Sequence, residues 1–351
     1  MRLLIFVGTG NSLAGPEIST RIPSSRQESE YIYSFENPDK DDAIRIVSRL
    51  GSSLKMAEEI PVEDVTPRTL ASLIKEKEFS VTNLTNLTNF TESRSLCEEI
   101  KKILGNVRFI LPKNEFGLSP VINTKNKVAE LFVDSKEKKA YQTIWVHDFE
   151  HWIKKDREMP FVNARAGMLP PKIARSMVNL VPGGTNGKTL VDPFCGSGRI
   201  LVEAAELGYK VVGLDISQSQ ADDTKANIKH LEIEGEVIVF DATHLSEKFT
   251  DLDCIVTEPF LGKPNIRPDR VDYAVKGLEK LYQGCLKDWH KALKKGGYIV
   301  MVFPILTGLK KEYHTSRIID SVKNLGYNQL SRVVYSRPEA GVKREIITLQ
   351  K

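Results

Sequence analysis

The feature that most constrains the fold is a short apolar strand that runs into a glycine-rich turn and then into a helix. The predicted strand covers residues 189–194 and includes Asp192 and Phe194, and the turn that follows contains Gly196 and Gly198. Such a turn lets a ligand approach the backbone closely, because glycine has no Cβ. From this point strands and helices alternate to the end of the chain, which predicts a doubly wound α/β domain over residues 181–351.

Acidic residues end the next two predicted strands as well. Asp215 follows Gly198 at close to the spacing (~20 residues) at which an acid accepts ribose hydroxyls in such folds. Asp241 ends the third strand, where it can accept a hydrogen bond from an adenine amino group. Asp192 would then lie beside the cationic amino-acid end of the same ligand. The pattern predicts a nucleoside-binding edge of the sheet.

Two other phosphate-binding motifs fit the sequence poorly. The dinucleotide fingerprint needs a third glycine where Leu201 stands. Residues 183–189 resemble a phosphate-binding loop, but Pro182 occupies the first glycine position and the segment precedes a strand instead of following one. Nothing in the first motif supports close approach of a pyrophosphate, and we interpret the second as a chance similarity.

The fourth predicted strand, residues 253–257, is followed by an acid, a proline and an aromatic residue. These are Glu258, Pro259 and Phe260. The carboxyl end of this strand is where ligand and substrate meet in such sheets. A tight turn is the alternative interpretation of the same residues, and both stay open at this point.

The first half of the chain reads as smaller α+β modules. We predict one module over residues 1–60 and a second over residues 61–150, followed by a linker and helix over residues 151–180. Basic residues gather at 136–139 and at 154–165. A solvated turn and an RNA contact are both compatible with the first run, and a phosphate path is compatible with the second.

Composition adds limits on the class of protein. The 351 residues are 41% hydrophobic and 27% charged with a net charge of +4, which is ordinary for a globular protein and permits a nucleic-acid partner. No apolar stretch approaches the ~18–20 residues that span a bilayer. The cysteines form no CxxC pair, so we expect reduced thiols in a cytoplasmic protein, with no metal site and no membrane contact. The cysteines are Cys97, Cys195, Cys254 and Cys285.

Residues 192–198 resemble motif I of the amino-methyltransferases. Residues 166–174 are similar to the segment that precedes this motif in the archaeal-type tRNA guanosine N2-methyltransferases, which modify position ten of tRNA. The resemblance implies a Rossmann-like methyltransferase domain, S-adenosylmethionine as cofactor and tRNA as partner. It also implies a ferredoxin-like subdomain at 1–60 and a THUMP domain at 61–150. The implied cofactor-binding residues are Asp192, Phe194, Gly196, Gly198, Asp215 and Asp241.

The motif that holds the substrate amine departs from the family pattern. The family usually has Asp or Asn, two prolines and an aromatic residue, whereas residues 258–261 are Glu-Pro-Phe-Leu. We expect Glu258 and the Pro259 carbonyl to accept hydrogen bonds from an exocyclic amine of the target base and Phe260 to stack on that base. The amine that we predict is N2 of guanosine. Two alternatives remain, an RNA-binding protein with a degenerate methyltransferase domain and an adenine N6-methyltransferase of RNA or DNA.

Overall fold

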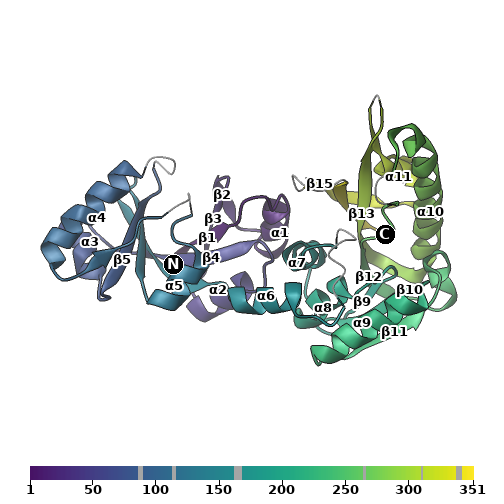
Figure 1. Cartoon of the computed structure of the whole chain (residues 1–351), viewed down its shortest axis with the longest axis horizontal. Coiled ribbons are helices and arrows are strands. Elements are labelled where there is room, and N and C mark those ends of the chain that lie inside the picture. The colour runs from purple at the N-terminus through teal and green to yellow at the C-terminus, as the bar shows by residue number, and fades with distance from the viewer. Residues whose placement is uncertain (86–89, 113–115, 162–167, 264–265, 310, 337–341) are drawn as a thin grey trace. The chain divides into compact units, whose positions relative to one another are not determined.

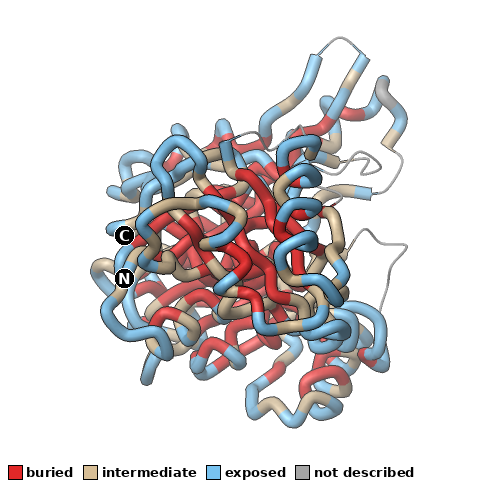
Figure 2. The backbone as a smooth tube through the Cα atoms, turned by 90° about the vertical axis from the view of Figure 1, so that its left-hand side faces the viewer, coloured by how far each residue is buried: buried red, intermediate tan, exposed pale blue. Residues whose placement is uncertain are grey.

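The computed structural model describes the chain except residues 86–89, 113–115, 162–167, 264–265, 310 and 337–341 (Figure 1). The chain forms two compact units. Unit 1 comprises residues 1–9 and 22–151, and unit 2 comprises residues 10–21 and 152–351. Buried segments lie in the interior of the tube and exposed segments at its outside (Figure 2).

Unit 1 is built on one sheet, which has eight strands among the described residues, in the order β2-β3-β1-β4-β8-β7-β5-β6. Its strands are β1 (Arg2–Val7), β2 (Arg26–Ser29), β3 (Ile32–Glu36), β4 (Ser53–Ile60), β5 (Glu78–Asn83), β6 (Arg108–Phe109), β7 (Ala129–Asp134) and β8 (Lys139–Val146). The antiparallel pairing of β4 with β8 joins the predicted modules 1–60 and 61–150 into this single sheet. One apolar cluster, which includes Leu4, Phe6 and Phe132, packs residues from both modules together.

The helices of unit 1 differ in what they bury, because the first three bury apolar side chains and the last buries none of its residues. They are α2 (Lys40–Val47), α3 (Pro67–Leu73), α4 (Thr91–Leu104) and α5 (Pro120–Asn126). The basic run 136–139 lies at the β7–β8 connection. There the Asp134 carboxylate accepts from the backbone N–H groups of Lys136 and Glu137. This geometry makes residues 136–138 an exposed turn, whereas Lys139 begins β8 and is half-buried.

A buried ion pair lies inside unit 1. The Lys55 ammonium on β4 lies 2.7 Å from Glu130 on β7, and both side chains are buried. Glu130 also accepts from Leu118 N, Asn123 Nδ2 and Thr143 Oγ1. Because burial of a charge is favourable only when it is paired and hydrogen-bonded, this cluster holds the start of α5 against the sheet.

Unit 2 contains the predicted doubly wound sheet, in the order β11-β10-β9-β12-β13-β16-β15. Its strands are β9 (Thr189–Asp192), β10 (Lys210–Asp215), β11 (Gly235–Val239), β12 (Leu252–Thr257), β13 (Leu293–Thr307), β15 (Asn328–Tyr335) and β16 (Lys343–Gln350), with β14 (Glu312–His314) paired to β13. β9 to β13 run parallel, and β15 and β16 are antiparallel additions. The strand order reverses between β9 and β12, which is where such sheets bind ligands.

Helices cover this sheet and complete the core of unit 2. They are α7 (Pro171–Asn179), α8 (Arg199–Glu206), α9 (Gln218–His230), α10 (Val271–Ala292) and α11 (Ile318–Ser321). The long helix α10 buries Tyr282 and Trp289 against the sheet. Within the described residues, no helix is long and apolar enough to cross a bilayer.

A short N-terminal helix, α1 (Ala14–Arg21), belongs to unit 2, which the sequence did not predict. Its buried Glu17 accepts from Ser176 Oγ at 2.9 Å and from Asn179 Nδ2 at 2.6 Å, both on α7. Arg21 donates to the Asn179 side chain and to the Gly183 carbonyl. These side-chain bonds fasten the first helix of the chain to the methyltransferase half of the sequence.

Helix α6 (Phe149–Arg157) corrects one expectation for the basic run 154–165. Lys155 is buried and bonds Glu203 at 3.0 Å and Glu206 at 2.9 Å, so it does not face a phosphate path. Two acids on α8 draw this lysine inward, because an ion paired with them satisfies its charge without solvent. Arg165 lies outside the described residues, as do residues 166 and 167 of the family-like segment.

Candidate active site

A cleft of about 760 Å³ opens at the carboxyl ends of β9, β10, β11 and β12. Eight of the nine predicted site residues line it, and Gly198 is the exception. The eight are Asp192, Phe194, Gly196, Asp215, Asp241, Glu258, Pro259 and Phe260. The structure therefore brings the two predicted groups, at 192–241 and at 258–260, to one place.

The glycine turn is shaped by two residues with positive φ, Gly196 at 53° and Gly198 at 81°. A Cβ on Gly198 would lie 2.9 Å from Thr224 Cγ2, so this glycine lets the turn pack against α9. The atom nearest to a Cβ on Gly196 would be Gln220 Oε1, at 3.7 Å, and this glycine lines the cleft. Gly196 is thus the position at which a ligand can approach the backbone.

Asp192 lies at the end of β9 with its carboxylate fully buried. Its Oδ1 accepts from Thr257 Oγ1 at 2.6 Å and from Phe194 N at 3.2 Å. Burial raises the pKa of Asp192 to about 7, against the lowering effect of these two hydrogen bonds. A cationic ligand group would return the carboxylate to its charged form.

Asp215 ends β10 and holds two backbone turns together. Its Oδ2 accepts from Gly196 N at 3.1 Å, and its Oδ1 accepts from Ser217 N at 2.9 Å. Because each carboxylate oxygen has two lone pairs, further donors can still bind. The acid therefore fixes the glycine turn and also offers acceptors to the cleft.

Asp241 follows β11 and caps the 3₁₀ helix η2 (Ala242–Glu247). Its Oδ1 accepts from the backbone N–H and the hydroxyl of Thr243, both at 2.8 Å. The backbone hydrogen bond is the largest factor that lowers the pKa of Asp241. The side chain is half-exposed at the mouth of the cleft, so its charge faces solvent and ligand alike.

Glu258, directly after β12, is ion-paired with Arg344 on β16. Arg344 Nε donates to Glu258 Oε1 at 2.5 Å, and the two side chains are 8% and 18% exposed. Burial raises the pKa of Glu258, while Arg344 opposes this effect. The acid is thus a buried, paired group that lines the cleft, which a turn residue in solvent would not be.

The two residues after Glu258 differ in exposure. Pro259 is buried, whereas the Phe260 side chain is 54% exposed and lines the cleft. The Phe260 carbonyl accepts from the Tyr282 hydroxyl at 2.6 Å. This bond anchors the backbone of the segment to α10 and leaves the aromatic ring at the rim.

Several lining residues escaped the sequence reasoning. Ile216 is 72% exposed beside Asp215, which is unusual for a large apolar side chain. The sequence feature that could have predicted this role for Ile216 is its position directly after the acid that ends a strand. Leu169, Gln220 and Arg344 also line the cleft, and Arg344 had no local signal because it lies 86 residues from Glu258.

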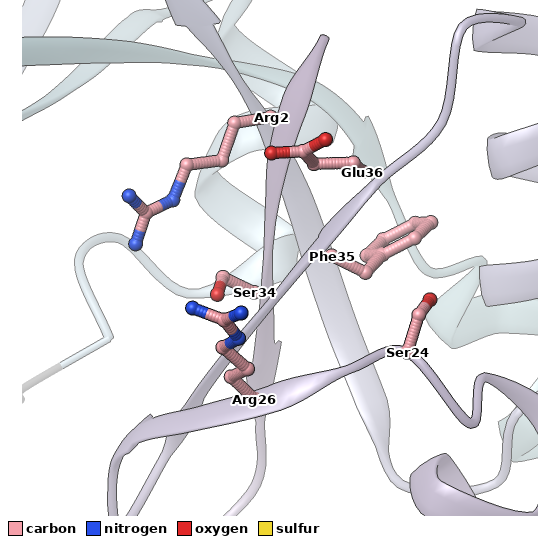
Figure 3. Close-up of a pocket in the computed structure, with 6 residues that line it drawn as sticks. All are labelled: Arg2, Ser24, Arg26, Ser34, Phe35 and Glu36. Atoms are coloured by element: carbon pink, nitrogen blue, oxygen red, sulfur yellow. The ribbon is translucent and has the colours of Figure 1, made fainter.

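A second hollow, of about 330 Å³, lies in unit 1 beside β1, β2 and β3 (Figure 3). Arg2 and Arg26 lie there with Ser34, but Glu36 lines the same hollow and Arg2 bonds Glu28 at 2.8 Å. The two positive charges are balanced, so we assign no ligand to it. Among the described residues no cluster of His, Cys, Asp or Glu is arranged to hold a metal ion.

A doubly wound sheet with a cleft at its switch point, bordered by acids on successive strands, is the architecture of a domain that binds a nucleoside cofactor. Comparison with known families agrees. A model described as RMKL-like, methyltransferase domain matches residues 162–329, and one described as DNA methylase matches residues 21–226.

Named relatives narrow the class. The tRNA (guanine(10)-N2)-dimethyltransferase of Methanothermobacter thermautotrophicus is 41% identical over 141 residues, which is 39% of this chain and 39% of that protein. The probable tRNA (guanine(10)-N2)-dimethyltransferase of Methanothermococcus thermolithotrophicus is 31% identical over 138 residues, 37% of this chain and 77% of the other. The chain therefore belongs to the family of methyltransferases that these models and relatives define. This confirms the prediction of a methyltransferase.

A solved structure resembles the whole chain in fold. The crystal structure of TrmN from Thermus thermophilus aligns with a TM-score of 0.57 and 16% identity, over 100% of this chain and 99% of that one. The match shows that the two chains share a fold. By sequence, the alignment with the Methanothermobacter relative covers less than half of that protein's length.

Proposed function

We propose that the protein is a cytoplasmic, S-adenosylmethionine-dependent tRNA methyltransferase that methylates N2 of a guanosine of the position-ten type. The observation that carries the proposal is the single cleft that joins Asp192 and Asp215 to Glu258 and Pro259. The named relatives, tRNA (guanine(10)-N2)-dimethyltransferases, support the choice of RNA and of base.

The cleft residues match the parts of S-adenosylmethionine. The buried Asp192 carboxylate suits the ammonium of the amino-acid end, and Asp215 suits the ribose hydroxyls. Phe194, Gly196 and Gly198 form the turn that the cofactor passes, with Asp241 near the adenine amine. The exposed side chain of Ile216 offers an apolar face to the adenine ring. When bound, the cofactor supplies an electrophilic methyl group.

Glu258, Pro259 and Phe260 would prepare the target base. The exocyclic amine is a poor nucleophile because its lone pair is delocalised into the ring. Hydrogen bonds from the amine to Glu258 and to the Pro259 carbonyl favour a more pyramidal nitrogen, whose lone pair then points at the methyl group. Phe260 would stack on the base, a contact worth about 1–3 kcal/mol. Glu258 would accept the proton that the amine releases once it has taken the methyl group, while the methyl–sulfur bond of the cofactor breaks and leaves a neutral thioether.

The base must leave its stack to reach this cleft, which costs a few kcal/mol that RNA contacts must offset. We propose that residues 1–60 and 61–150 supply those contacts as ferredoxin-like and THUMP-like parts, with residues 151–180 connecting them to the catalytic domain 181–351. The exposed turn at 136–138 is a candidate phosphate contact. Affinity for tRNA should then fall steeply with salt, because bound phosphates release counterions.

The test is nucleoside mass spectrometry after the purified protein is incubated with S-adenosylmethionine and unmodified tRNA transcripts. We expect N2-methylguanosine or its dimethyl form. N6-methyladenosine would instead support the alternative of an adenine methyltransferase, which the match to the DNA methylase model favours. Tight tRNA binding with no methylated nucleoside would support the degenerate, RNA-binding alternative.

A further inference from the structure

The ion pair between Glu258 and Arg344 holds the acid that we place at the substrate amine. Both residues line the cleft, and both side chains are largely buried. Arg344 Nε donates to one carboxylate oxygen, Oε1. Among the described residues no hydrogen bond reaches the other oxygen, Oε2, so the carboxylate is held at one side only.

From this geometry we infer that Arg344 is the positioning residue of the amine site. It fixes Glu258 through Oε1 and thereby leaves Oε2 for the amine of the target base. The inference rests on the proposed function, since it deepens the role of the same cleft. It adds to that function a residue from β16, a strand that carries none of the predicted site residues.

The length of the acid at 258 gives a physical reason for this arrangement. Glutamate is one methylene longer than aspartate and has one more rotatable bond. An unrestrained glutamate would lose side-chain entropy each time it engaged the amine. A guanidinium that already holds Oε1 removes this freedom before the base arrives, in a site where small displacements strongly affect rate.

The electrostatics of the pair point the same way. In the part of the chain that the structure describes, three titratable groups interact with Glu258, namely Arg344, Asp192 and Tyr282. Of these Arg344 alone is cationic, and it opposes the rise in the pKa of Glu258 that burial causes. Without Arg344 the carboxyl group would hold its proton to higher pH, and a protonated acid is a poorer acceptor for an amine.

The first measurement needs no enzymatic activity. Carbon-13 NMR follows the titration of the Glu258 carboxyl group in the full chain, with Glu258→Gln to assign its signal. In Arg344→Met we expect the midpoint to rise by about one pH unit or more, whereas Arg344→Lys keeps most of the effect. An unchanged midpoint in Arg344→Met would overturn the inference, whatever the wild-type protein does to tRNA.

The second measurement separates positioning from folding. In Arg344→Met we expect kcat to fall about a hundredfold while the affinity for S-adenosylmethionine is unchanged. The acid limb of the pH–rate profile should shift to higher pH. The matched control is Arg332→Met, which breaks an Arg–Glu pair between β15 and β16 and should keep kcat. Wild-type kcat and pH profile in Arg344→Met would refute positioning. Absence of methylation by the wild type would refute the proposed function and leave the titration result to decide the role of Arg344.

If Arg344→Met folds poorly, the double variant Glu258→Gln with Arg344→Met serves in its place, because it removes both buried charges together. The double variant should recover the melting temperature but not the turnover, and should be no slower than Glu258→Gln alone. A further loss of turnover in the double variant would show that Arg344 acts independently of Glu258, against the inference.

Discussion

Asp192→Asn should remove the pH dependence of S-adenosylmethionine binding. In the wild type, burial raises the pKa of Asp192 to about 7, with Asp215 and Glu258 adding to the effect. About nine tenths of the carboxyl groups are then ionised at pH 8 and about one tenth at pH 6. If the ligand's ammonium binds the ionised form, the affinity should be about tenfold weaker at pH 6 than at pH 8.

The Asp192 carboxyl group should have the opposite effect on stability: ligand affinity rises with pH, whereas the free energy of unfolding falls. A carboxyl group whose pKa is raised by folding keeps a proton between about pH 4 and pH 7 that the unfolded chain releases. The stability of the ligand-free protein should therefore decrease as pH rises through this window. The loss is on the order of 4 kcal/mol at most, because one pH unit corresponds to about 1.4 kcal/mol. Asp192→Asn should be the more stable protein above pH 7.

Isothermal titration calorimetry in buffers of different ionisation enthalpy tests both the affinity and its proton count. We expect the wild type to release close to one proton per ligand bound at pH 6 and close to none at pH 8. Asp192→Asn should bind weakly at both values and release none. Equal wild-type affinity at pH 6 and pH 8, with no proton release, would refute the role of Asp192.

Three further changes have directions that the structure predicts. Asp215→Ala should weaken S-adenosylmethionine binding about tenfold or more by calorimetry, because it leaves ligand hydroxyls without a partner and frees the Gly196 N–H. Gly198→Ala should destabilise the protein, because the φ of residue 198 is 81° and the added Cβ would lie 2.9 Å from Thr224. Gly277→Ala, in the exposed middle of α10, should instead stabilise the protein by about 1 kcal/mol, because alanine has the higher helix propensity. Thermal melting of the two variants checks this contrast, and equal shifts would contradict it. Lys155→Met should cost about 3 kcal/mol in urea unfolding, because it leaves Glu203 and Glu206 short of one buried cation, while Lys40→Met at an exposed pair should cost less than about 1 kcal/mol.

The sequence predicted the parts of the site that are local in the chain. A strand, an acid and a glycine turn lie within about ten residues, and their geometry follows from backbone rules that neighbouring residues dictate. The acids at 192, 215 and 241 converge because the carboxyl ends of parallel strands share one edge of a sheet. The same rule brought Glu258 to the cleft.

Contacts between distant segments could not be predicted in this way. Arg344 reaches Glu258 across 86 residues, and Glu17 reaches Asn179 across 162. Periodicity says which face of an element is apolar, but it does not say which charged side chain another element will pair. For the same reason the run of basic residues suggested a phosphate contact for Lys155, which two acids on α8 hold inside the protein.

The most direct test of the central claim is nucleoside mass spectrometry of tRNA from cells with and without the gene. We predict that N2-methylated guanosine falls on deletion and returns with the wild-type protein. It should also return with Glu279→Gln, which removes an acid that pairs with Arg317 outside the cleft, but not with Glu258→Gln. Unchanged N2-methylated guanosine on deletion, or full restoration by Glu258→Gln, would contradict the account.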